Sequence, residues 1–308
     1  MTDTSTPARV PGLRGRLPAV FPPELQTMAA YLVTPLPTPK YPIDVSGGAT
    51  FAMDGNGPDP TLTVNGGNPC GDCGFAGMSH KRTADAACGH EASFVPDTSD
   101  EVVTEYLAFD NGQDQGVVVS AMMNAWFSSG FFGQKIAGYV PIRVSDIDAA
   151  LGVFGAIICG VNLTDDADQL FSEGLPWTVA NGEVPDPNEG HVIVKVRSTV
   201  DEDTYVTWGA LQPATKEWSA ACIEEAWGVV DSQMAANAQM NLTALLNDIR
   251  SIGGGQVQAP APVSNGAPPA PGPVVAIEDA IEHEAETVIH DVEQFAEDEI
   301  AKIEHKLP

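Results

Sequence analysis

The sequence predicts an α+β fold in which a helical half comes first and an antiparallel β half follows. Apolar residues recur at helical spacing over roughly residues 73–130. Short apolar runs typical of strands come later, between about residues 135 and 230. Hydrophobic residues make up 43% of the 308 residues, which is enough apolar side chain for a substantial core.

Changes in composition divide the chain into four expected parts. Residues 1–66 are rich in Pro and Gly and predict an extended arm whose aromatic residues need burial, with one short helix over Pro23–Leu32. Residues 67–252 have the composition of a globular domain. A Gly/Pro/Ala linker follows over 253–273, and 274–308 predicts an acidic amphipathic helix on that tether.

Within the globular part, each element is predicted from its own pattern. The helical half is expected to hold helices over Cys73–Ala87, from a cap at Ser99 through Leu107, and over Val117–Ser129. Strands are expected over Lys135–Ile142, Ala156–Leu163, His191–Ser198, Thr204–Trp208 and Glu225–Val230. Further helices are predicted over Ser145–Phe154 and from about Ser232 to Ile252, and Thr164–Gly190 is expected to be a loop.

Charge and cysteine usage exclude several classes of function. Asp and Glu total 42 against 14 Lys and Arg, for a formal net charge of −28. Phosphate-backbone binding needs clustered cations, so nucleic acid is not an expected partner, whereas a basic partner surface would suit this charge. No apolar run is long enough to span a bilayer, and the start of the chain lacks the apolar core of a signal peptide. Five irregularly spaced cysteines suggest a reducing compartment and no disulfide framework.

The stretch 68–77 carries the chemistry, and two interpretations of it remain open. Cys73 begins a predicted helix, where unpaired backbone N–H groups and the helix dipole favour a reactive thiolate. The alternative is a structural zinc site built from the Cys-x2-Cys and a later Cys-x-His, namely Cys70, Cys73, Cys88 and His90. The acids at 165–168 lack the spacing of a calcium loop, and no motif calls for a cofactor.

Three patches in order support the first interpretation. They are Gly71-Asp72-Cys73-Gly74, then Gly190-His191-Val192, then Thr207-Trp208-Gly209. A cysteine at a loop-to-helix junction, a histidine opening a strand and a strand ending in Trp-Gly resemble papain-like cysteine peptidases, over about residues 67–231. More narrowly, these patches resemble papain-like proteins of unassigned function encoded by phages of actinobacteria. The resemblance implies a papain-like α+β domain.

Carried over residue by residue, the resemblance implies that Cys73 is the nucleophile and His191 the base that takes its proton. The oxyanion hole would then use the Cys73 backbone N–H with the side-chain amide of Asn68, or next of Asn65.

The chain departs from the family pattern at two positions. Gly74 stands where papain has a tryptophan after the nucleophile, and Val206 stands where the family has the asparagine that orients the histidine. Thr207, before Trp208, or an acid in the 183–189 loop is therefore expected to orient His191.

Two functions of different class follow. In the first, the chain is a virion-associated structural or assembly component with a catalytically silent papain-like domain, found in the virion or the host cytoplasm. Its 274–308 helix would then bind other phage particle proteins or a second copy, in coiled-coil fashion. In the second, the chain is an active cysteine peptidase or amidase that uses Cys73 and His191.

Overall fold

The computed structural model describes residues 14–57, 71–89, 97–179, 183–230 and 240–252, all within one compact unit. The expected linker 253–273 and the expected helix 274–308 lie outside the described residues. Within the described part of the chain, no helix is both long and apolar enough to cross a membrane.

An antiparallel sheet forms the β half, and the α+β prediction is confirmed. Its strands run in the order β2-β7-β3-β4-β5-β6, with β1 paired to β4. They are β1 Ile43–Asp44, β2 Gly138–Pro141, β3 Ile157–Asn162, β4 Gly190–Ser198, β5 Glu202–Thr207, β6 Ala210–Thr215 and β7 Ile223–Val230. Strand β4 lies in the interior of the sheet between β3 and β5, and its residues are almost all buried.

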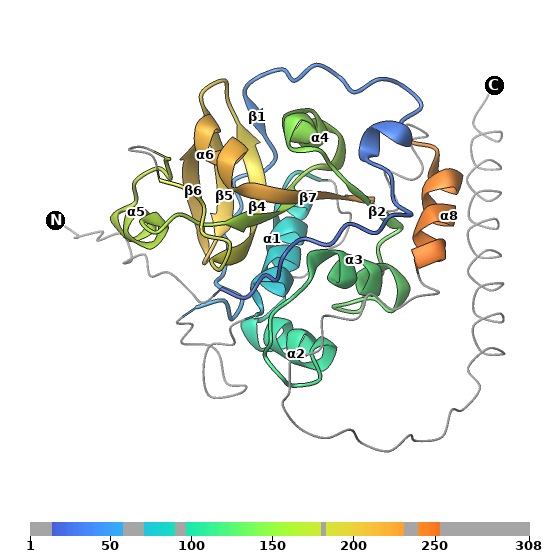
Figure 1. Cartoon of the computed structure of the whole chain (residues 1–308), viewed down its shortest axis with the longest axis horizontal. Helices are drawn as coiled ribbons and strands as arrows, with labels where there is room; N and C mark the ends of the chain where they lie inside the picture. The colour runs from blue at the N-terminus through green and yellow to red at the C-terminus, as the bar shows by residue number, and fades with distance from the viewer. Residues whose placement is uncertain (1–13, 58–70, 90–96, 180–182, 231–239, 253–308) are drawn as a thin grey trace, which may run out of the picture. The chain divides into compact units, whose positions relative to one another are not determined.

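Three helices form the helical half, and the first of them joins it to the sheet. They are α1 Cys73–Ala87, α2 Ser99–Phe109 and α3 Val119–Ser128. Helix α1 lies against β4 near the centre of the molecule (Figure 1). A Cβ at Gly77 would stand 3.0 Å from a methyl group of Val192, so this glycine permits the close approach of helix and strand. The first turn of α1 is thereby held beside the start of β4.

The N-cap of helix α2 lies one residue before the position that the sequence predicts. Thr98, not Ser99, is the N-cap, because the Thr98 hydroxyl accepts from the Glu101 backbone N–H while the Glu101 carboxylate accepts from the Thr98 backbone N–H. Both threonine and serine satisfy the N-cap preference, and the reciprocal bond to an acid three residues later decides between them.

Five further elements, a 3-10 turn and four helices, complete the described part of the fold, and two of these helices and the strand β6 escape prediction. They are the 3-10 turn η3 Val144–Asp146 with helices α4 Ile147–Phe154, α5 Ala167–Glu173, α6 Lys216–Cys222 and α8 Leu242–Ile252. Helix α5 lies inside the expected loop, and β6 and α6 fall in a stretch with no strong periodicity. Pro213 argues against a strand, yet β6 ends the strand order, where a missing N–H is tolerated. Its carbonyl accepts from the Trp177 backbone N–H at 2.9 Å.

The described part of the arm is packed against the body. Leu25, Met28 and Tyr31 are buried, and the Tyr31 hydroxyl donates to Asp248 of α8 at 2.7 Å. The expected helix over Pro23–Leu32 is wrong, since only the 3-10 turn η1 Met28–Ala30 forms. Part of the reason is that the Gln26 backbone N–H donates to the Tyr31 hydroxyl instead of to a helical carbonyl. The arm is therefore part of the fold.

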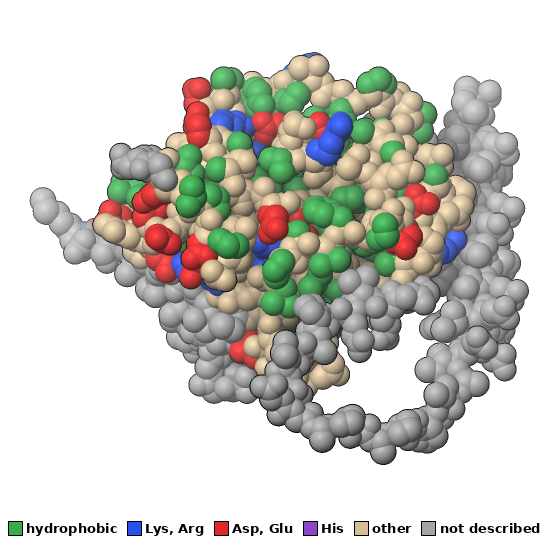
Figure 2. Space-filling view, viewed as in Figure 1, with side chains coloured by type: hydrophobic (Ala, Val, Ile, Leu, Met, Phe, Trp, Pro, Cys, Tyr) green, Lys and Arg blue, Asp and Glu red, His purple; other side chains and the backbone are tan. Residues whose placement is uncertain are grey.

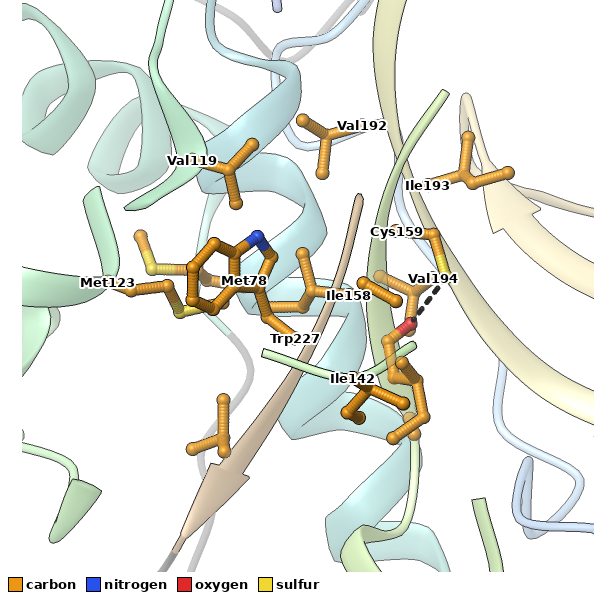
Figure 3. Close-up of a cluster of buried hydrophobic side chains, with 14 of the residues drawn as sticks. Met78, Val119, Met123, Ile142, Ile158, Cys159, Val192, Ile193, Val194 and Trp227 are labelled. Atoms are coloured by element: carbon orange, nitrogen blue, oxygen red, sulfur yellow. Dashed lines mark hydrogen bonds between the residues drawn. The ribbon is translucent and has the colours of Figure 1, made fainter. Parts of the chain in front are cut away.

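The core between α1 and the sheet is apolar and closely packed. In Figure 3, Val192 points toward α1 and Val119, whereas Ile193 lies on the opposite face of β4 beside Cys159. Cys159 is fully buried in this core, and its thiol lies 3.7 Å from the Ile157 carbonyl oxygen. Cys159 thus behaves as a small core residue.

Candidate active site

Cys73 is the first residue of α1 and is almost completely inaccessible. Its exposed fraction is 1%. Burial and the neighbouring Asp72 charge raise the pKa of the thiol to about 12, against hydrogen bonds from the backbone of Val192 and Gly15. The helix start that favours a thiolate is therefore outweighed by desolvation, and the sulfur is a neutral thiol in this structure.

The tight loop before α1 fixes the position of Cys73. A Cβ at Gly71 would stand 2.1 Å from the Tyr106 hydroxyl oxygen, so only glycine fits there. The Gly71 backbone N–H donates to Asp114 at 3.1 Å, and the Asn56 amide donates to Asp72 at 2.9 Å. These bonds from the α2–α3 connection and the arm hold the backbone where α1 begins.

His191, the second residue of β4, is buried against Thr207 and Trp208. Its Nε2 atom lies 2.8 Å from Thr207 Oγ1, and its ring stacks on Trp208 at 4.8 Å with an interplanar angle of 27°. Among the described residues, its Nδ1 atom has no hydrogen-bond partner. Burial lowers the pKa of His191 well below the ordinary 6.5, and the nearby Arg14 charge acts in the same direction. The imidazole is therefore neutral.

A two-residue hairpin turn presents Thr207 and Trp208 to the histidine. Strands β5 and β6 pair up to Thr207 and Ala210, which leaves Trp208 and Gly209 as the turn. Both have positive φ, 46° and 70°, as a type I′ turn requires. Trp208 accepts this unfavourable conformation inside a buried aromatic cluster with Phe171 and Trp177. The turn thus supplies one hydroxyl and one ring face to His191.

Residues 14–17 of the arm lie between the helical half and the β half. The Gly15 carbonyl accepts from the Val117 backbone N–H at 2.8 Å, and the Leu17 backbone N–H donates to the Val117 carbonyl at 2.9 Å. On the other side, the Arg16 backbone N–H donates to the Gly190 carbonyl at 3.1 Å. In Figure 1 the dark blue trace of the arm passes in front of α1, between α3 and the sheet. Residues 14–17 therefore join the helical half to the β half where Cys73 and His191 lie.

The two arginines of this segment are held by acids of the β half. Arg14 forms ion pairs with Asp168 and Glu189. Arg16 pairs with Glu224 at 2.6 Å and with Glu225 at 3.2 Å. The Arg16 side chain is 1% exposed, so its partners replace water almost completely.

The residues that cover Cys73 and His191 are not predicted from the sequence. Arg14 and Arg16 do not stand out from the other charged residues of the arm. Their acidic partners are scattered through the sequence from 168 to 225. One signal was present: two of only 14 basic residues stand two positions apart in a chain with 42 acids. Alternate side chains of an extended segment point the same way, so that spacing indicates a paired contact with an acidic surface.

The other predicted site residues stay apart or fall outside the described residues. Asn68, Asn65, Cys70 and His90 are not among the described residues, so the oxyanion prediction stays a prediction. Cys73 and Cys88 stand at opposite ends of α1, about 22 Å apart at 1.5 Å per residue, which excludes one zinc ion bound to both. The predicted zinc site of Cys70, Cys73, Cys88 and His90 is therefore wrong. Within the described ranges, no three His, Cys, Asp or Glu side chains are grouped to hold a metal ion.

Charges of both signs lie on the face of the molecule drawn in Figure 2. On the face drawn in Figure 2, the described residues show no continuous field of Lys and Arg, and acidic side chains lie beside most of the cations.

Comparisons with solved structures give a similarity at low sequence identity. No family model matches the sequence, and no curated protein matches it. Among solved structures, this chain is similar to digestive procathepsin L 3 of Tenebrio molitor larval midgut, with 12% sequence identity and a TM-score of 0.38. The match covers 72% of this chain and 76% of that chain.

Proposed function

We propose that the chain is a phage-encoded, virion-associated protein that serves particle assembly, with a papain-like domain whose Cys73/His191 site is silent in the closed state. The proposed inactivity of the site rests on the burial of Cys73. The Gly15 backbone forms a hydrogen bond to its sulfur, the residue is 1% exposed, and the pKa of its thiol is about 12. A neutral thiol covered by its own chain cannot attack a substrate carbonyl.

The assembly role and the phage association rest on the sequence. The three patches around Cys73, His191 and Trp208 resemble phage proteins, and a tethered acidic helix over 274–308 suits attachment to particle partners or to a second copy. Burial of the arm on the body supports a protein that functions through fixed contacts rather than as a freely accessible enzyme.

A cysteine hydrolase is the second candidate, favoured by the contact between Thr207 and His191. The hydroxyl at 2.8 Å from Nε2 holds the ring in one orientation and leaves the buried Nδ1 free to take a proton. In such an enzyme the Cys73 proton passes to His191, the thiolate forms a bond to the substrate carbonyl, and the leaving amine takes that proton. Water then releases the acyl group. This chemistry requires the arm to leave.

Two variants of the full chain distinguish the candidates in the encoding phage. A chain ending at residue 255 should be missing from purified particles, while Cys73→Ser should be incorporated normally and yield infectious particles. Mass spectrometry of gradient-purified particles measures both. Particles that retain the truncated chain would refute attachment through 274–308. Normal incorporation combined with lost infectivity for Cys73→Ser would favour the hydrolase.

A further inference from the structure

Residues 14–17 show how an extended peptide is bound in this protein. Their backbone makes hydrogen bonds to Val117 on one side and to Gly190 on the other. This is the mode in which a peptide strand is recognised, where main-chain bonds give affinity and alternate side chains give specificity. We use the name arm cradle for the residues that hold the segment: Val117, Asn162, Asp168, Glu189, Gly190, Glu224 and Glu225.

The arm cradle carries more negative charge than its two arginines neutralise. Arg14 meets two carboxylates, of Asp168 and Glu189, whose side chains are 47% and 35% exposed. Arg16 meets two more, and the Asn162 side-chain oxygen accepts from its guanidinium at 2.5 Å. Two positive charges thus face four negative ones, so the cradle strongly favours a cationic segment over a neutral one.

The deeper of the two charge sites contains one fully buried ion pair. Glu225 is 0% exposed and lies 3.2 Å from Arg16. Burial raises the pKa of Glu225, while the Trp227 indole N–H, which donates at 2.7 Å, and the Arg16 charge oppose that rise. The Arg16 Nε atom also donates to the Val161 carbonyl at 3.3 Å. Guanidinium suits this set of acceptors better than an ammonium, because its donors are spread over a planar fork.

Glycines make room for the backbone of the bound segment. A Cβ at Gly190 would stand 2.3 Å from the Arg16 carbonyl oxygen, and one at Gly116 would stand 2.3 Å from the Gly15 carbonyl oxygen. The backbone conformation at position 190 does not require glycine, since its φ is not positive. The space at this position is therefore used by the peptide that crosses it.

We propose that the arm cradle is a recognition site for an extended peptide that carries two arginines separated by one residue, supplied in trans by a basic partner protein. Residues 14–17 occupy the same site in cis and compete with that peptide. The inference rests on the proposed function in one respect, namely that residues 14–17 close a site from which they are able to leave. Binding itself uses charge and backbone pairing and needs no reaction at Cys73.

Peptide binding to the full-length chain tests this directly. The probe is fluorescein-labelled Leu-Arg-Gly-Arg-Leu-Pro, the sequence of residues 13–18, and the matched control peptide is Leu-Gln-Gly-Gln-Leu-Pro. The wild-type chain, whose cradle is filled, should bind neither in fluorescence anisotropy. The Arg14→Ala/Arg16→Ala chain, whose own segment has lost its anchors, should bind the arginine peptide. Its affinity for the glutamine peptide should be lower by about 30-fold or more.

A second variant keeps the test decisive if the double variant fails to fold. Asp168→Arg/Glu189→Arg changes the two partly exposed side chains that face Arg14, so folding should persist. It should repel Arg14 and reverse the preference at that position, so that Leu-Glu-Gly-Arg-Leu-Pro binds more tightly than the arginine peptide. Equal affinity of the folded variants for all the peptides would overturn the proposal. Fast alkylation of Cys73 in the wild-type chain would instead refute the closed site, so the two claims fail separately.

Discussion

Replacing Arg16 with alanine should destabilise the fold through one buried carboxylate. Glu224 is 38% exposed and gains water when Arg16 is lost, so its ion pair contributes little. Glu225 is fully buried, and losing the partner of a buried ion costs about 3–5 kcal/mol. The Trp227 indole still donates to Glu225 at 2.7 Å, so the expected loss is smaller, about 2–3 kcal/mol.

Urea unfolding of four chains isolates this contribution. They are the wild type, Arg16→Ala, Glu225→Gln and the double variant, and the free energy of unfolding comes from the midpoint and slope of each transition. The double variant should regain about 1–2 kcal/mol relative to the sum of the single losses, because the neutral amide needs no cation. A loss below about 0.5 kcal/mol for Arg16→Ala, or no coupling to Glu225, would refute the assignment of this pair as a main anchor of the arm.

The same pair predicts a pH dependence with a definite sign. A carboxyl group whose folded-state pKa is raised above its unfolded value of about 4.5 contributes stability below that value and loses it as pH rises. Without Arg16 one cause that lowers the pKa of Glu225 is gone, so its pKa rises further. The Arg16→Ala loss should therefore be smaller at pH 5 than at pH 7.5.

Three further predictions concern the site and the helices. Thr207→Val removes the hydroxyl from His191 Nε2 and should cost about 1–3 kcal/mol in urea unfolding, whereas Thr207→Ser should keep most of that stability. His191 has a lowered folded pKa, so the wild type should lose stability as pH falls below 6.5, and His191→Gln should flatten that decline in unfolding free energy between pH 7 and 5; an unchanged decline would contradict a buried neutral imidazole. Thr98→Ala should cost about 1 kcal/mol and Thr98→Ser much less, measured in the same way, because Thr98 caps α2.

Much of the fold can be predicted because its signals are local. Helix α1 runs over the predicted range, since the turn-forming glycines before it and its own run of helix formers mark both ends. The buried strand after Gly190 carries an equally local signal. Helix α6 and strand β6 lack them, because their positions depend on tertiary contacts such as the Trp177 pairing.

The site could be predicted only in part for a related reason. Cys73, His191 and Thr207 stand out by residue type and neighbours, and the sequence indicates them. What covers them depends on contacts across more than 100 residues, such as Arg16 with Glu225, and on glycines whose purpose is visible only when another backbone lies against them. The raised pKa of the Cys73 thiol results from burial by these contacts and not from the position of Cys73 at the start of a helix.

The alkylation rate of Cys73 is the most direct test of a site closed by residues 14–17. Iodoacetamide at pH 7 with peptide mapping measures it in the wild type and in Arg14→Ala/Arg16→Ala, with buried Cys159 as the internal reference. A shift from a pKa near 12 toward the ordinary value of about 8.5 raises the thiolate fraction by about 10³-fold. The account predicts that Cys73 reacts as slowly as Cys159 in the wild type and faster by about that factor in the folded double variant. Fast reaction in the wild type, or equally slow reaction in both, would contradict it.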